Sequence, residues 1–331
     1  IKIMAISVVL LFLISGFSVM VYGASGSGYN GFRSYKNTLN NINSSITDSA
    51  GWLSYNWGPD MNNTNSYSSS TTYSGSTTVP FNITWQANTS YSPITADLYK
   101  NGYLDLIVET SPSTISIYNA NGMVIHTLNP PNNAGLSGGT ITYYEVDYMN
   151  SQPMIVVGVL DANGNNPTVI IYNGNGSIAK ILSTGLPDTI QPHLVDLQGD
   201  GNYDVVVNFY DSYTGPRGIA VYSYSTGQHL WTYYTGPYIS DISFSDLLGN
   251  GQMDIVLSTF APCNGQTGDG TNDCTAYVIV LSPSGSVIWM HAMGQGEVHT
   301  RVAIVKLPGS SLPDVFFLVH SSDLVDPDGS N

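Results

Sequence analysis

A nine-residue pattern that begins and ends with aspartate recurs at regular intervals and limits the choice of fold more than any other feature. Its clear copies are Asp97–Asp105, Asp196–Asp204 and Asp246–Asp254, and each precedes an apolar run. Degenerate copies begin at Asp147 and Lys306, so successive starts lie 50, 49, 50 and 60 residues apart. A period of about 50 residues indicates a series of supersecondary units, because one such unit cannot bury its apolar face alone.

Each repeat carries the signals of four strands. The apolar stretch after the nine-residue pattern is typical of a strand buried on both faces, and a strand, a glycine turn and a further strand follow it. The sequence therefore predicts an all-β fold, a β-propeller with four-stranded blades, of which four are complete and a fifth is incomplete. The turn glycines are Gly122, Gly176, Gly227 and Gly285. The expected blades cover residues 94–140, 141–190, 191–237, 238–298 and, incompletely, 299–331.

The pattern D-L-x-G-[DN]-G-x-x-D, followed by three apolar residues, resembles the FG-GAP/VCBS-type propeller repeats of integrin α-like heads and many secreted microbial proteins. The match rests on repetition and extends over about residues 94–320. Residues 79–87, which contain NITWQ, suit a closure strand that completes the last blade. The resemblance implies a secreted or cell-surface protein for adhesion, which binds a glycan or protein ligand through loops on one propeller face.

The repeat loops carry oxygen-bearing residues at the spacing of a hard-cation site. Side chains at positions 1, 3, 5 and 9 and the carbonyl of position 7 can converge where glycine at position 6 permits a tight turn. Ca²⁺ takes roughly 6–8 oxygen ligands, so water would complete the shell. The predicted ligands are Asp97, Asn101, Tyr103 and Asp105 in the first loop, Asp196, Gln198, Asp200, Asn202 and Asp204 in the second, and Asp246, Asn250, Gln252 and Asp254 in the third.

The loop that starts at Asp196 should bind Ca²⁺ most tightly. It offers three carboxylates and Gln198 at position 3, whereas the other two loops carry a tyrosine or a leucine there. We expect a structural role for these ions. A loop held only by aspartate-turn hydrogen bonds is the alternative, above all at the Asp147 copy. In the last copy the ammonium of Lys306 is expected to replace the cation and pair with Asp314.

The N-terminus carries an apolar run, Ile3–Tyr22, that is long enough to span a bilayer and follows Lys2. Residues 1–23 are therefore predicted to be a signal or membrane-anchor helix. The alternative is a filament-core helix through which copies self-associate, because this layout resembles archaeal type IV pilin-like proteins. Residues 24–78, rich in Ser, Thr, Tyr and Asn, are predicted to be a stalk before the propeller of residues 79–331. Either alternative places the rest of the chain outside the cell.

Cysteine and asparagine usage agrees with an extracellular or cell-surface location. Cys263 and Cys274 bracket one loop rich in Gly, Asn and Asp, so a local disulfide is sterically easy. Two free thiols are the alternative, which an oxidising compartment disfavours. Sequons for N-glycosylation cluster before residue 90 and predict a glycoprotein stalk. They stand at Asn43, Asn62, Asn82, Asn88 and Asn175.

Charge is scarce and mostly negative. Charged residues make up 9% of the chain, against roughly 25% in an ordinary soluble domain. Lys plus Arg is 8 and Asp plus Glu is 23, which gives a formal charge of −15. Eight scattered basic residues cannot form a phosphate-tracking surface, so nucleic acid is excluded as a partner.

No motif marks a catalytic centre. H-E-x-x-H, the P-loop and C-x-x-C are absent, and the histidines are isolated, so each is expected to be an ordinary strand or loop residue. Thr226–Trp231 resembles the T-G-x-x-x-W docking repeat of quinoprotein propellers, in which the tryptophan packs blade against blade. We expect no enzyme activity, and the alternative is a quinoprotein-like or polysaccharide-lyase-like propeller enzyme. The histidines are His126, His193, His229, His291, His299 and His320.

Overall fold

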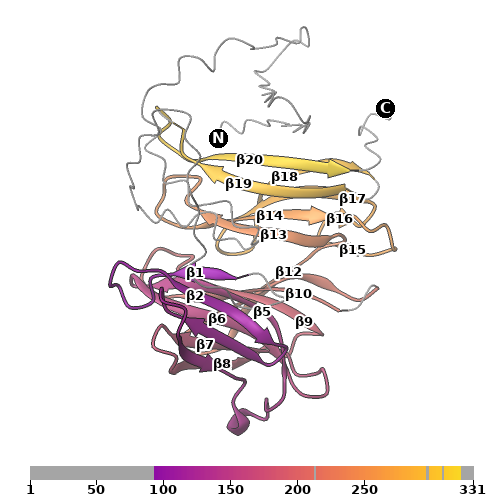
Figure 1. Cartoon of the computed structure of the whole chain (residues 1–331). Coiled ribbons are helices and arrows are strands. Elements are labelled where there is room, and N and C mark those ends of the chain that lie inside the picture. Colours follow the sequence, from indigo (N-terminus) through magenta and orange to yellow (C-terminus); the bar gives the residue numbers. More distant parts are fainter. Residues whose placement is uncertain (1–92, 212–213, 296–297, 308, 322–331) are drawn as a thin grey trace, which may run out of the picture.

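The computed structural model describes residues 93–211, 214–295, 298–307 and 309–321, and the regular secondary structure of this part is β-strand apart from one 3-10 turn (Figure 1). Its main strands form successive antiparallel sheets that follow the order of the sequence. Sheet 1 consists of β1 (Ile94–Ala96), β2 (Asp105–Ser111), β3 (Thr114–Tyr118) and β4 (Val124–Leu128), and a single 3-10 turn, η3 (Asn132–Ala134), follows it.

Sheets 2 and 3 repeat this arrangement. In each, four strands pair antiparallel in sequence order. Sheet 2 consists of β5 (Thr140–Met149), β6 (Gln152–Leu160), β7 (Thr168–Asn173) and β8 (Ile178–Ser183). Sheet 3 consists of β9 (Thr189–Val195), β10 (Asp204–Tyr210), β11 (Arg217–Ser223) and β12 (His229–Tyr234).

Sheet 4 has the same four-stranded path and a further hairpin attached to it. β14 and β19 pair antiparallel at one position, where Phe260 lies opposite His299. The two-stranded hairpin β15–β16 lies in the insertion before β17. Sheet 4 consists of β13 (Tyr238–Ser245), β14 (Asp254–Phe260), β17 (Thr275–Leu281) and β18 (Val287–Gln295); the attached hairpin is β19 (Val298–Val305) and β20 (Asp314–Ser321), and the small one is β15 (Thr267–Gly268) and β16 (Thr271–Asn272).

The sheets stack face to face, with an apolar layer between each sheet and the next. β5 contacts β9 and β13 contacts β19, so first strands of successive repeats lie side by side. Separate core clusters join sheets 1 and 2, 2 and 3, 3 and 4, and sheet 4 with the last hairpin. This is how propeller blades pack, and the predicted all-β fold with repeated four-stranded antiparallel sheets is confirmed. The predicted N-terminal helix lies outside the described residues.

The apolar run after each loop forms the second strand of its sheet, as its hydrophobicity predicts. In β10, Val205 and Val207 pack in the cluster shared with sheet 2, while Val206 packs in the cluster shared with sheet 4. All three side chains are fully buried. Full burial of such a side chain contributes about 1.5–3 kcal/mol, so a strand covered on both faces joins three sheets into one core.

Glycine turns on the outer edge fit against the outer strand of the preceding sheet. At Gly285, where φ is +83°, an added Cβ would lie 2.7 Å from the ring of Trp231. The Trp231 Nε1–H also donates to the carbonyl oxygen of Pro283 at 3.1 Å. A Cβ added at Gly176 would likewise lie close to the side chains of His126 and Leu128 in sheet 1. The predicted packing of Trp231 between successive blades is therefore confirmed.

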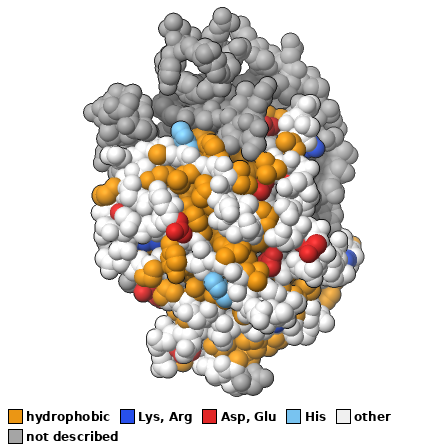
Figure 2. All heavy atoms as spheres, turned by 180° about the vertical axis from the view of Figure 1, so that it is seen from behind, with side chains coloured by type: hydrophobic (Ala, Val, Ile, Leu, Met, Phe, Trp, Pro, Cys, Tyr) orange, Lys and Arg blue, Asp and Glu red, His pale blue; other side chains and the backbone are white. Residues whose placement is uncertain are grey.

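The visible surface is largely uncharged. Figure 2 shows one face on which uncharged polar and hydrophobic side chains cover most of the described area, with only scattered acidic and basic groups. Within the described ranges, no helix has the length and apolar character needed to cross a bilayer.

Candidate functional site

The three clear repeat loops share one hydrogen-bond frame. In the loop from Asp196 to Asp204, the carboxylate at position 1 accepts the backbone N–H groups of Asp200 at 3.1 Å and Gly201 at 2.8 Å. The carboxylate of Asp200 accepts the N–H of Asn202 at 2.9 Å. The same bonds recur in the other two loops, which start at Asp97 and Asp246.

Position 9 of each loop is buried where the second strand begins. Asp105 and Asp254 each accept the N–H of the residue at position 2, at 3.3 Å and 3.2 Å. Asp254 is completely buried, and within the described part of the chain its Oδ1 has no hydrogen-bond partner. A buried carboxylate oxygen without a partner is costly, and a bound cation would satisfy it.

The carboxyl group at position 9 has a raised pKa in each of the three loops. Burial raises the pKa of Asp204 to about 6, and the charges of Asp196 and Asp200 add to the rise. Burial is also the main cause of the raised pKa of Asp254, with Asp246 adding to it. By contrast, the N–H donated by Asn202 lowers the pKa of Asp200. A divalent cation between positions 1, 5 and 9 would relieve this repulsion.

The donor chemistry of the loops fits Ca²⁺, but the side chains are turned toward the loops' own amides. No group of three or more His, Cys, Asp or Glu within the described residues is arranged to hold a metal ion. Only the loop from Asp196 contains three carboxylates, since Asn101 and Asn250 occupy position 5 elsewhere. An oxygen that accepts one N–H keeps a second lone pair for a cation.

The loop from Asp196 touches the loop from Asp246 directly. The predicted ligand Gln198 instead accepts the Nε2–H of Gln252 at 2.9 Å, and the N–H of Met253 donates to the Leu197 carbonyl at 2.9 Å. The side chain at position 3 thus serves the contact between sheets 3 and 4. Gln252 and Asn202 were predicted to bind the ion through their carbonyl oxygens. Their backbone N–H groups donate to the side chain at position 5 of their own loops. The side chain of Tyr103, at the equivalent place, is 67% exposed.

The degenerate copy that begins at Asp147 does not form such a loop. At the Asp147 copy, β5 and β6 pair up to Met149 and Gln152, so a tight turn with Asn150 and Ser151 at φ +51° and +60° replaces it. The alternative of a loop held by aspartate-turn hydrogen bonds is therefore wrong for this copy.

The last copy also differs from its prediction. Lys306 is exposed. The Oδ2 of Asp314 is buried without a hydrogen-bond partner among the described residues. An exposed Lys306 and an Asp314 Oδ2 without a partner do not fit the expected pairing of these two groups.

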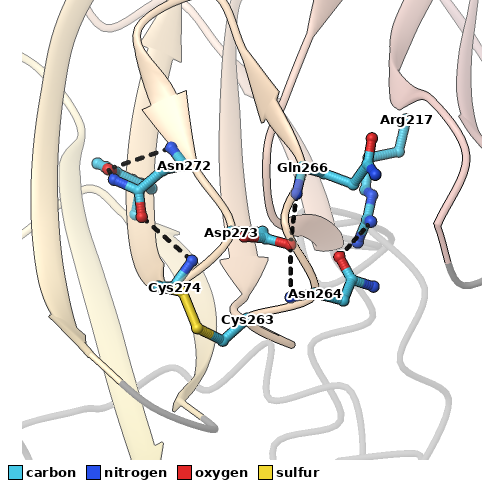
Figure 3. Close-up of a disulfide and its surroundings, with 8 residues drawn as sticks. Arg217, Cys263, Asn264, Gln266, Asn272, Asp273 and Cys274 are labelled. Atoms are coloured by element: carbon cyan, nitrogen blue, oxygen red, sulfur yellow. Dashed lines mark hydrogen bonds between the residues drawn. A yellow bond between two sulfur atoms is a disulfide. The ribbon is translucent and has the colours of Figure 1, made fainter.

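The predicted disulfide between Cys263 and Cys274 is present and closes a loop that braces sheets 3 and 4 (Figure 3). Buried Asp273 holds this loop, because its Oδ2 accepts the N–H groups of Asn264 at 2.7 Å and Gln266 at 2.9 Å. A residue of sheet 3 also contacts this loop.

Arg217 of β11 reaches the disulfide loop from the neighbouring sheet. Its Nη2–H donates to Asn264 Oδ1 at 2.9 Å, and its guanidinium lies 3.9 Å from the centre of the Tyr238 ring. The carboxylate of Asp269 accepts the N–H of Tyr234 at 2.7 Å. The insertion therefore connects sheet 3 to sheet 4.

A buried polar cluster joins sheets 2 and 3 and was not expected from the sequence. His193 Nδ1–H of β9 donates to Glu145 Oε1 of β5 at 2.5 Å, and the Tyr143 hydroxyl donates to Glu145 Oε2 at 2.9 Å. Asp147, two residues beyond Glu145 on β5, accepts the N–H of Leu194 at 2.6 Å. His193 is a residue of strand β9, as expected, and its side chain also joins sheet 3 to sheet 2.

One sequence signal could have indicated this cluster. Tyr143, Glu145 and Asp147 stand at alternate positions, so they lie on one face of a strand. Three titratable groups in a row on the face of an otherwise apolar repeat are unusual, and two of the chain's three glutamates, Glu109 and Glu145, are buried. The partner, His193, is 48 residues away and could not be assigned without the fold.

Most of the predicted glycosylation sites fall outside the described residues. The sequon residue Asn175 is exposed in the turn before β8, and the other four sequons lie outside the described residues. One motif was not predicted: the segment from Gly135 to Gly139 matches the G-x-S-x-G spacing, and it forms turns between η3 and β5. Its serine therefore lacks the strand-to-helix elbow of a hydrolase nucleophile.

The sequence matches no family model and no curated protein. Among solved structures, it is similar to the quinohemoprotein alcohol dehydrogenase of Comamonas testosteroni, with 15% identity, 67% of this chain and 38% of that chain covered, and a TM-score of 0.44. It is also similar to the Dos1 propeller, with 13% identity, 63% and 49% covered, and a TM-score of 0.41. A third is the exotype rhamnogalacturonan lyase YesX, with 12% identity, 67% and 44% covered, and a TM-score of 0.43.

The described chain spans less than half the length of each of these three structures. At this level of identity and superposition, their activities are not assigned to the present chain. The propeller-type fold rests on the pairing and stacking of its own sheets.

Proposed function

We propose that this chain forms the propeller part of a secreted or cell-surface protein for adhesion, and that Ca²⁺ held in the repeat loops stabilises it. The observation that carries the proposal is the grouping of three carboxylates in the loop from Asp196 to Asp204, where burial, followed by the charges of Asp196 and Asp200, raises the pKa of Asp204 to about 6. The disulfide between Cys263 and Cys274 supports an oxidising compartment.

Asp196, Asp200 and Asp204 would hold the ion, together with the carbonyl oxygen of Asn202. The ion would neutralise charge and tie the start of the loop to the start of β10. Loops in this position set the contact between sheets 3 and 4, because the loops from Asp196 and Asp246 touch. Bound Ca²⁺ would therefore stabilise the packing of neighbouring blades.

The ligand-binding part of the proposal rests on exposed loop residues of sheet 1. Tyr103, Tyr99 and Leu104 expose 67%, 42% and 45% of their surfaces. Amphipathic tyrosine rings are favoured in recognition surfaces, because they supply large contact area and a hydroxyl at low entropic cost. An uncharged glycan or protein surface suits this composition better than a highly charged partner.

Isothermal titration of the full chain with Ca²⁺ tests the metal part. Asp200→Ala should abolish the tightest binding event, and affinity should fall below about pH 6, where Asp204 takes up a proton. Asp188→Asn, which removes an exposed carboxylate outside the loops, should leave binding unchanged. Unchanged Ca²⁺ binding in Asp200→Ala would contradict the site.

A glycan array probed with the full chain tests the adhesion part. Binding should weaken when Tyr99 and Tyr103 are replaced by serine and should be unaffected by serine at Tyr118, a partly buried residue of β3. Equal binding by both variants would contradict a ligand site at the first loop.

A further inference from the structure

Position 5 of the repeat loop is an asparagine followed by glycine in two of the three clear copies. These pairs are Asn101–Gly102 and Asn250–Gly251, whereas the third copy has Asp200–Gly201. In an asparagine–glycine pair the glycine nitrogen can attack the side-chain amide carbon, because the glycine has no side chain to obstruct the approach. Both asparagines are exposed, so the water that completes such a reaction has free access.

Two hydrogen bonds in the loop from Asp246 favour that attack. The N–H of Gly251 donates to Asp246 Oδ2 at 2.8 Å, so a carboxylate is in place to accept the proton that the nitrogen must lose. The side-chain Oδ1 of Asn250 accepts the N–H of Gln252 at 2.9 Å. This second bond polarises the amide carbonyl and strengthens as negative charge develops on its oxygen.

The first loop contains the same two bonds. The N–H of Gly102 donates to Asp97 Oδ2 at 2.8 Å, and Asn101 Oδ1 accepts the N–H of Tyr103 at 2.9 Å. A Cβ added at Gly102 or at Gly251 would meet nothing within 4 Å. Both loops therefore activate the asparagine–glycine pair in the same way and leave it open to solvent.

The pair Asn121–Gly122 in the outer turn of sheet 1 differs in the group that receives the glycine N–H. Gly122 donates to the backbone carbonyl oxygen of Asn119 at 2.8 Å, and such an oxygen is a far weaker proton acceptor than a carboxylate. The side chain of Asn119 holds this turn by accepting the N–H groups of Asn121 and Met123, both at 3.0 Å. Asn121 is exposed as well, so this turn is a matched control within the same chain.

We propose that Asn101 and Asn250 deamidate spontaneously in the folded protein and become aspartates. The glycine nitrogen forms a bond to the side-chain amide carbon, and its proton passes through the carboxylate at position 1 to the departing ammonia. Water then opens the cyclic imide at the former side-chain carbon and restores the peptide bond. In sum, asparagine and water yield aspartate and ammonia, without an oxidant or a reductant.

The loop from Asp196 shows that the product fits the frame. Asp200 Oδ1 accepts the N–H of Asn202 at 2.9 Å, which is the bond that Asn250 accepts from Gln252. Deamidation therefore gives all three loops three carboxylates and keeps their hydrogen bonds. Because carboxylates are preferred Ca²⁺ ligands, the capacity for Ca²⁺ increases as the protein ages, a consequence that rests on the proposed function of the loops.

Peptide mass spectrometry of the full chain, incubated in EDTA at neutral pH in heavy-oxygen water, tests the reaction. Asn101 and Asn250 should deamidate at least about tenfold faster than Asn121, because a positioned proton acceptor typically contributes about 10²–10⁴-fold. In urea, which removes the loops, the three rates should become equal. Equal rates at the three pairs in the folded chain, or isoaspartate as the only product, would overturn the proposal.

Asp246→Asn tests the role of the carboxylate directly. The rate at Asn250 should fall by at least about tenfold, because the proton acceptor is lost. The rate at Asn101 in the same molecules should stay as in the wild-type protein and serves as the control for folding. A rate at Asn250 that is unchanged or higher would overturn the proposal.

Ca²⁺ titration of fresh and aged protein separates this reaction from the function of the loops. Aged protein and the variant Asn250→Asp should both bind more Ca²⁺ than fresh protein. Deamidation to aspartate without a gain in bound Ca²⁺ would contradict the proposed function and leave the reaction standing. A gain in Asn250→Asp without deamidation of the wild-type protein would overturn the reaction and leave the function of the loops standing.

Discussion

Asp147 and Asp196 occupy the first position of the same nine-residue pattern in neighbouring sheets, but their carboxylates accept hydrogen bonds from different parts of the molecule. Asp196 accepts two N–H groups of its own loop, from Asp200 and Gly201. Asp147 accepts the N–H of Leu194 in the next sheet. Loss of the loop in sheet 2 frees its aspartate for contact between sheets.

The difference arises from the residues that follow each aspartate. In sheet 3, Gly199 and Gly201 adopt φ of +67° and +85° and form an open loop around Asp196. In sheet 2, Asn150 and Ser151 form a two-residue turn, which continues the strand pairing to Met149. The shorter turn provides no loop amides to the aspartate, which instead accepts the N–H of Leu194 in the neighbouring sheet. Repeated sequences thus keep a fold while one position changes its role.

The largest effect should come from His193→Ala, which removes the partner of buried Glu145. Breaking a buried ionic pair from one side costs about 3–5 kcal/mol, because the other group stays buried. The free energy of unfolding, measured in urea, should fall by that amount. The matched change at exposed His229 should cost less than about 0.5 kcal/mol. Equal small losses in both variants would mean that Glu145 does not depend on His193.

Gly199→Ala should have the next largest effect and should act on the sheet 3 loop. Its Cβ would lie 1.9 Å from the carbonyl oxygen of Gly251, in addition to the cost of a left-handed backbone. We expect about 1–2 kcal/mol from the backbone and about 1–3 kcal/mol from the clash.

Gly201→Ala is the control for that change. This glycine shares the positive φ, but an added Cβ there meets nothing within 4 Å. The difference in unfolding free energy between the two variants measures the contact between the loops of sheets 3 and 4. Identical losses would show that this contact contributes no stability.

Tyr203→Phe should have the smallest effect and tests a hydrogen bond that joins the two regions. The Tyr203 hydroxyl oxygen accepts the N–H of Asn150 in the sheet 2 turn at 2.8 Å. Because this bond is exposed, water can replace it, and the loss should be about 0.5–1 kcal/mol. A loss above about 2 kcal/mol would mean that the turn and the loop fold as one unit.

Much of the fold could be predicted because it depends on patterns that repeat. The period of about 50 residues gave the four-stranded sheets, and the apolar runs gave the strands buried on both faces, such as Val205 to Val207. The two cysteines in one loop gave the disulfide. These features are local in sequence, so spacing and hydrophobicity were enough to identify them.

The inter-sheet contacts could not be predicted in the same way. Glu145 and His193 come together only because β5 and β9 are neighbours, and Gln198 turns toward Gln252 because two loops touch. The role of Asp147 was missed because its pattern resembles that of Asp196, while the turn that follows is two residues long. Side-chain direction depends on the next sheet, which a single repeat does not encode.

The most direct test of the account compares Asp147→Asn with Asp196→Asn in the full chain. The shift of the thermal unfolding midpoint on addition of Ca²⁺ should be measured at neutral pH for each variant and for the wild-type protein. Asp196→Asn should lose part of the Ca²⁺-induced rise, because it removes a carboxylate from the loop that binds best. Asp147→Asn should keep the whole rise. An equal loss in both variants, or a loss only in Asp147→Asn, would contradict the division of roles between the two aspartates.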